Sequence, residues 1–140
     1  MVDYAPHAEL KRVILAEGLK GGVAMAVVAI VFAVVGLSPS MTWVPEVLLL
    51  AAAILVPVVI LGVTGFRVGG RSTRVSAGTL AGALAGAIGG LAGGLSYVVF
   101  GKPTLNIVAG MLAGAMAGGV IGATGALVGR RVGESTRRQL

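Results

Sequence analysis

Side chains that could do chemistry are scarce in this chain, and their scarcity excludes several functional classes. Cysteine is absent, which excludes a disulfide, a thiolate metal site and a cysteine nucleophile. His7 is the single histidine, so one chain cannot assemble a multi-histidine metal site. Glu46 follows Pro45, and we interpret it as a helix-start residue near the positive end of the helix dipole. We therefore predict no metal, no cofactor and no enzymatic activity.

The cores of the long apolar stretches carry no ionisable side chain. Of the residues, 56% are hydrophobic and 11% charged, against about 25% charged in a typical soluble domain. Four apolar stretches predict membrane-spanning helices at about 22–37, 45–66, 75–100 and 105–129. The first is barely long enough to span unless it begins earlier, at or before Leu19. Ionisable groups inside such helices usually mark proton relays, ion coupling or gating charges. Their absence argues against a proton-coupled exporter and against a voltage sensor.

The predicted architecture is an all-α integral membrane protein whose four transmembrane helices form one domain, residues 21–129. Residues 1–20 mix apolar and charged side chains and predict a short amphipathic helix, which lies at the membrane surface or runs straight into the first span. Residues 67–76 are predicted to form a basic loop, and residues 130–140 a basic, mobile tail. Pro57 lies inside the second span and predicts a kink, because proline removes one backbone hydrogen bond.

The third and fourth spans are organised by glycines at every fourth position. These glycines are Gly78, Gly82, Gly86, Gly90 and Gly94, and then Gly110, Gly114, Gly118 and Gly122. In water each would cost a helix about 1 kcal/mol relative to alanine. In a bilayer the helix persists, and the bare backbone lets a neighbouring helix approach closely. Because Leu80, Leu84 and Ile88 gather on the opposite face, we predict glycine toward protein and leucine toward lipid.

The two glycine-rich spans are copies of one pattern. Residues 77–95 and 109–127 align with an offset of 32 residues and 11 identities in 19 positions. Ile121 interrupts the bare face of the second copy, so the two faces are not equivalent. Two such helices joined by a short turn predict either a hairpin whose glycine faces meet or two faces that each meet something else.

Basic residues are distributed unevenly about the predicted spans. The net charge is +6, and with four spans Lys102 is the one basic residue of 11 that falls on the side away from the termini. By the positive-inside rule both termini face the cytoplasm, and we predict a prokaryotic cytoplasmic membrane. Topology explains the charge without a nucleic-acid partner. Anionic lipid headgroups are the predicted partners of Arg67, Arg71, Arg74, Arg130 and Arg131.

Two functional classes fit these features. In the first, the glycine faces drive tight helix packing in a scaffold or accessory subunit of a membrane assembly, with copies of itself or other subunits as partners. In the second, the protein is a small oligomeric channel, pore or transporter for a non-ionic or weakly selected solute. The glycine spacing of the third and fourth spans resembles that of pore-lining helices in small mechanosensitive channels, and the small size and basic tail also fit a phage holin. What the glycine faces touch separates the two classes.

Overall fold

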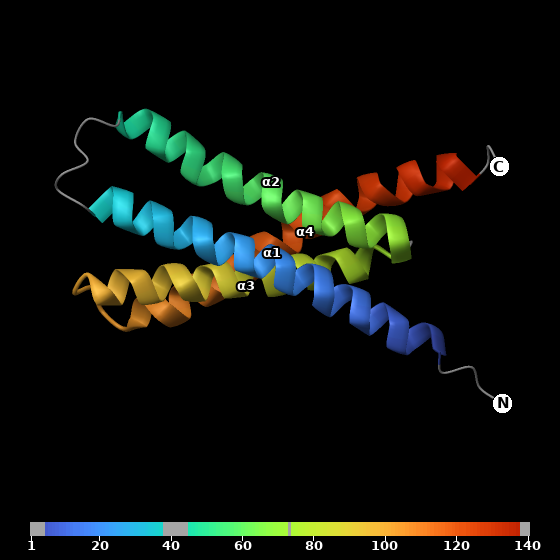
Figure 1. Cartoon of the computed structure of the whole chain (residues 1–140), viewed down its shortest axis with the longest axis horizontal. Coiled ribbons are helices and arrows are strands. Elements are labelled where there is room, and N and C mark those ends of the chain that lie inside the picture. Colours follow the sequence, from blue (N-terminus) through green and yellow to red (C-terminus); the bar gives the residue numbers. More distant parts are fainter. Residues whose placement is uncertain (1–4, 38–44, 73, 138–140) are drawn as a thin grey trace.

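The computed structural model describes residues 5–37, 45–72 and 74–137, and every element within these ranges is a helix (Figure 1). The helices are α1 (Ala5–Leu37), α2 (Glu46–Ser72), α3 (Val75–Val99) and α4 (Leu105–Arg137). Each is long and apolar enough to cross a membrane. The prediction of an all-α chain with four such helices is confirmed.

The helices alternate in direction, so that the start of α1, the end of α2, the start of α3 and the end of α4 lie at one end of the bundle (Figure 1). We call this the basic end, because it carries Arg12, Arg74 and Arg131. The α3–α4 turn, with Lys102, lies at the opposite, far end (Figure 1). α3 packs against α4, α1 packs on α3, and α2 packs on α4 while also contacting α1 and α3.

Three helices extend past their predicted limits at the basic end. Of the two alternatives for the N-terminal segment, the described part agrees with the second, since α1 runs from Ala5 without a break into the apolar stretch. α2 continues to Ser72, so the prediction that residues 67–76 form a basic loop is wrong. α4 continues to Arg137, so the tail predicted to be mobile at 130–140 is helical as far as it is described. Charged residues mark the end of an apolar stretch, but arginine is a good helix former, so the helix itself persists.

The first turns of α1 cover the basic end instead of lying apart from it. Val68 of α2 and Ala77 and Ala81 of α3 form a buried cluster there. Apolar side chains of α1 pack against this cluster, namely Leu10, Val13 and Ile14. The alternation of apolar and charged residues in this segment therefore reflects burial against two helices.

A tight turn sets α4 antiparallel to α3. Gly101 adopts φ +80°, a left-handed conformation that glycine tolerates best. Its N–H donates to the carbonyl of Val98 at 2.9 Å, and the N–H of Lys102 donates to the carbonyl of Tyr97 at 3.1 Å. These two bonds form a Schellman motif, which ends α3 cleanly. The short turn fixes the register in which the two glycine series meet.

Candidate functional site

The regularly spaced glycines of α3 and α4 lie against each other. The facing pairs are Gly78 with Gly122, Gly82 with Gly118, Gly86 with Gly114, and Gly90 with Gly110, while Gly94 faces Asn106. At the three central pairs, a methyl group on either glycine would stand less than 3.0 Å from the partner's carbonyl oxygen. Side-chain carbons do not come that close to backbone. In this structure the two faces therefore meet within one chain, and only glycine fits between them.

α4 carries a second glycine face, which our sequence reasoning missed. A side chain at Gly125 would collide with the carbonyl of Gly62, and one at Gly129 would collide with the carbonyl of Phe66. Both partners lie on α2. The signal was present in the sequence, because Gly125, Gly129 and Gly133 are also four residues apart.

Three helices meet at three glycines. Gly65 of α2 lies directly on the backbone of Gly122 of α4. A Cβ at Gly78 of α3 would stand 3.0 Å from the carbonyl oxygen of Gly122 and 3.2 Å from that of Gly65. Small residues that let backbones approach in this way are typical of helix contacts in membranes. α2, α3 and α4 thus share a contact made almost entirely of main chain.

The expectation that the aliphatic face of α3 points away from protein is wrong for Leu84 and Ile88. Leu84 fills the space over Gly18 of α1, and Ile88 fills the space over Gly22. α1 crosses α3 beside the glycine face, so α3 is covered on two sides. Leu80 remains exposed, as predicted for that face.

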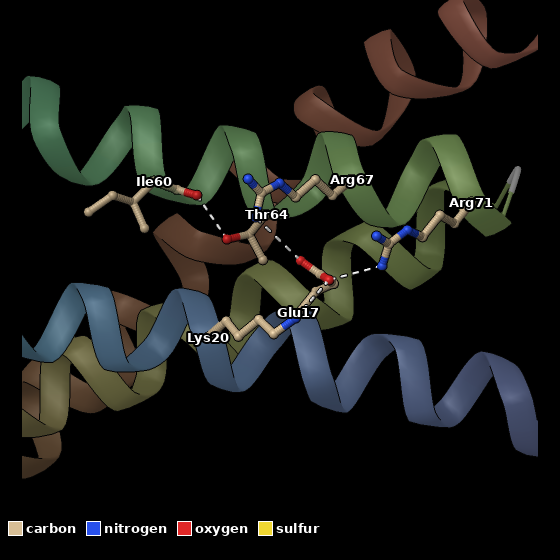
Figure 2. A network of polar contacts seen from close by, with 6 residues as sticks. All are labelled: Glu17, Lys20, Ile60, Thr64, Arg67 and Arg71. Atoms are coloured by element: carbon tan, nitrogen blue, oxygen red, sulfur yellow. Dashed lines mark hydrogen bonds and ion pairs between the residues drawn. The ribbon is translucent and has the colours of Figure 1, made fainter.

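A buried carboxylate marks the place where α1 crosses α2 near the basic end (Figure 2). The side chain of Glu17 is 4% exposed. Its Oε1 accepts a hydrogen bond from Nη1 of Arg71 at 2.9 Å. Oε1 also lies 3.5 Å from Nζ of Lys20, and Oε2 lies 3.8 Å from Nη1 of Arg67. The sequence did not predict the burial of Glu17, because that burial depends on α2, which comes much later in the chain.

The Glu17 cluster (Glu17, Lys20, Arg67 and Arg71) holds more positive than negative charge. Arg67 and Arg71 are one turn apart on the same face of α2, and Lys20 lies one turn after Glu17 on α1. A buried carboxylate without partners is costly, and the three cations remove that cost. The cationic side chains are 58–69% exposed, so they stay hydrated. The cluster can therefore tie α1 to α2 and still present a surplus of positive charge.

Small residues allow α1 and α2 to come this close. A side chain at Gly21 of α1 would collide with the hydroxyl of Thr64 on α2. Thr64 Oγ1 donates to the carbonyl of Ile60 at 2.8 Å, so the buried hydroxyl is satisfied by its own helix (Figure 2). The contact of Gly21 with Thr64 thus holds α1 close to α2. The Glu17 cluster lies next to this contact, one turn nearer the basic end.

Two hollows follow one another between α1 and α2. The first, of about 240 Å³, begins at the Glu17 cluster and is lined further along by Ala24, Val59, Ile60 and Val63. The second, of about 450 Å³, lies between the far halves of the two helices. Its lining is apolar apart from Glu46 and Tyr97, and it includes Pro57. Pro57 lies inside α2 as expected, and the kink remains a prediction.

The five arginines predicted to contact anionic lipid fall into two groups. Arg67 and Arg71 are partners of Glu17. The other three lie exposed at the basic end, and they are Arg74, Arg130 and Arg131. A single role for all five is thus too simple, because two of them also hold helices together.

Hydroxyl groups in the helices are used for local bonding. Thr79, Ser96 and Thr124 each donate to a carbonyl of their own helix, at 3.1, 2.9 and 2.7 Å. Within the described ranges, no three acidic or histidine side chains lie close enough together to hold a metal ion.

No protein-family model, curated protein or solved structure matches this chain. Its function must therefore be inferred from the glycine contacts, the Glu17 cluster and the surfaces around them.

Proposed function

We propose that the protein is a non-enzymatic, multi-pass membrane protein that serves as a scaffold or accessory subunit of a membrane assembly. In this proposal the four helices cross a prokaryotic cytoplasmic membrane with both termini in the cytoplasm. The observation that carries the proposal is the double use of α4, whose glycines contact α3 on one side and α2 on the other. Backbone packing of this kind brings the helices so close that no space for a solute remains between their glycine faces.

A rigid bundle needs an outer surface for its partners. Leu112, Met116 and Val120 are spaced by four on α4 and are all well exposed, Met116 by 74%. They form an apolar row on the side of the helix away from the α3 contact. Such a row suits either lipid or a helix of another subunit. We place the partner contact of the scaffold on this row.

The alternative, a small oligomeric pore or weakly selective transporter that includes a holin-like pore, has less support. A pore built on the predicted pattern would be lined by the glycine faces. In this chain the glycine faces of α3 and α4 lie on each other at backbone contact. A pore would therefore need a different lining, and the exposed apolar row offers neither charge nor hydroxyl groups for it.

Two measurements on the full-length protein test the proposal. Liposomes that contain the protein should release a small neutral or charged solute no faster than protein-free liposomes, and protein-dependent release would favour the pore. In native membranes, a photoreactive residue at Met116 should give a crosslinked product of one defined mass. The same residue at exposed Lys11, outside the row, is the matched control. If no position of the row gives a product, the scaffold proposal is overturned.

A further inference from the structure

The gap between α1 and α2 combines a charged cluster with an apolar hollow, and the proposed scaffold role explains neither of them. At one end stands the Glu17 cluster, in which three cations surround one carboxylate. Directly beside it begins the hollow of about 240 Å³, which Lys20 and Arg67 line together with apolar side chains. The Lys20 and Arg67 side chains are 69% and 58% exposed, so a ligand can reach them. The gap is thus charged at its basic end and apolar further in.

We propose that this gap binds one anionic phospholipid. The phosphate contacts Lys20 and Arg67 on their exposed sides, and an acyl chain lies in the hollow against Ala24, Val59 and Val63. The inference rests on the proposed membrane location, and it adds a specific binding site to it.

The charges of the cluster suit a phosphate. A guanidinium and an ammonium group are the two side-chain types that most often bind phosphate oxygens. Glu17 supplies one negative charge against three positive ones, and its shortest contact is with Arg71 at 2.9 Å, so the cluster keeps a positive surplus. Since Glu17 lies within 4.0 Å of both Lys20 and Arg67, it holds two like charges side by side. Glu17 is therefore a positioning residue for the phosphate site.

The apolar part of the hollow favours a lipid over a free phosphate ion. A free ion would need only the charged end of the gap. The hollow instead continues away from the basic end along Ala24, Val59 and Val63, in the direction in which a bilayer becomes hydrocarbon. A molecule with a phosphate at one end and an acyl chain at the other matches both parts at once.

The test measures which lipid stays bound to the full-length protein. The protein is placed in nanodiscs of equal parts phosphatidylcholine and phosphatidylglycerol, then extracted and weighed by native mass spectrometry. One phosphatidylglycerol per chain should remain bound in preference to phosphatidylcholine. Lys20→Gln combined with Arg67→Gln should lower that occupancy by about tenfold. The matched control is Lys11→Gln combined with Arg12→Gln, which removes the same charge from exposed positions of α1 and should change nothing.

A second variant distinguishes the binding of a phospholipid from the binding of a free phosphate ion. Val63→Trp fills the hollow without changing any charge and should also remove the bound lipid. Excess inorganic phosphate should fail to displace it. Displacement by phosphate, retention in the Val63→Trp variant, or equal losses in the matched control would each overturn the lipid site. A protein that never enters the nanodisc contradicts the proposed function as well, whereas an inserted protein without lipid preference contradicts this site alone.

Discussion

Glu17 is buried in the bundle and forms ion pairs with Lys20, Arg67 and Arg71. Removing one partner of a buried ion pair usually costs more than the pair contributes, because the remaining charge loses its compensation. Here the remaining charges would be cations that are more than half exposed, so water can compensate part of the loss. The expected cost is therefore moderate, and it falls on the contact between α1 and α2.

Glu17→Gln should lower the free energy of unfolding by about 1–2 kcal/mol. The amide keeps the size of the side chain but leaves Arg67 and Arg71 without a counter-charge. Unfolding by a denaturing detergent, followed by circular dichroism, measures the change. Glu9→Gln on the exposed side of the same helix is the control and should be neutral. Equal effects of the two substitutions would show that the ion pairs at Glu17 contribute nothing.

The glycines of α3 differ from one another in how much room they have. Gly86→Ala would drive a methyl group into the carbonyl of Gly114, whereas a methyl group at Gly93 would stand 3.6 Å from Cβ of Ala29, an ordinary contact. We expect Gly86→Ala to destabilise the protein by about 1–3 kcal/mol, the usual cost of overpacking, and Gly93→Ala to be tolerated. Thermal unfolding in detergent compares the two. Equal tolerance at both positions would mean that α3 and α4 are further apart than the structure has them.

At the scale of helices, some features could be predicted from sequence and others could not. The four apolar helices and the glycine spacing are local properties of the chain, so periodicity and hydropathy reveal them. The continuation of α2 through Arg67 and Arg71 could not be found that way, because hydropathy marks the end of an apolar stretch and not of a helix. The burial of Glu17 depends on that continuation of α2, so it could not be predicted from hydropathy either.

The predicted kink of α2 can be measured directly, because the chain has no cysteine of its own. Spin labels on cysteines introduced at Val34 and Val47 would report the distance between the far halves of α1 and α2. Pro57→Ala restores a backbone hydrogen bond, and straightening a kink of roughly 20° should move the far half of α2 by about 5 Å. Labels at Leu19 and Val63, nearer the basic end, should report no change. An unchanged distance between the first pair would mean that Pro57 does not bend the helix.

On the scale of the whole molecule, the basic residues are concentrated at one of the two ends that the fold defines. The helices that alternate in direction bring the first half of α1, the end of α2, the start of α3 and the last turns of α4 toward one end (Figure 1). Those are the segments that carry the basic residues, while Lys102 stands at the far end. The positive-inside rule then predicts which end faces the cytoplasm.

Orientation can be tested with one cysteine at each end. Lys11→Cys and Lys102→Cys replace exposed residues at the basic and far ends, so neither should disturb packing. In sealed vesicles with the cytoplasmic side inward, a membrane-impermeant maleimide should label Cys at position 102 and spare position 11 until the vesicles are opened. Inverted vesicles should give the opposite pattern. Labelling of both positions from the same side would rule out four spans, because an odd number of crossings must separate residue 11 from residue 102. Labelling of position 11 alone in the first preparation would instead place the basic end outside and reverse the predicted orientation.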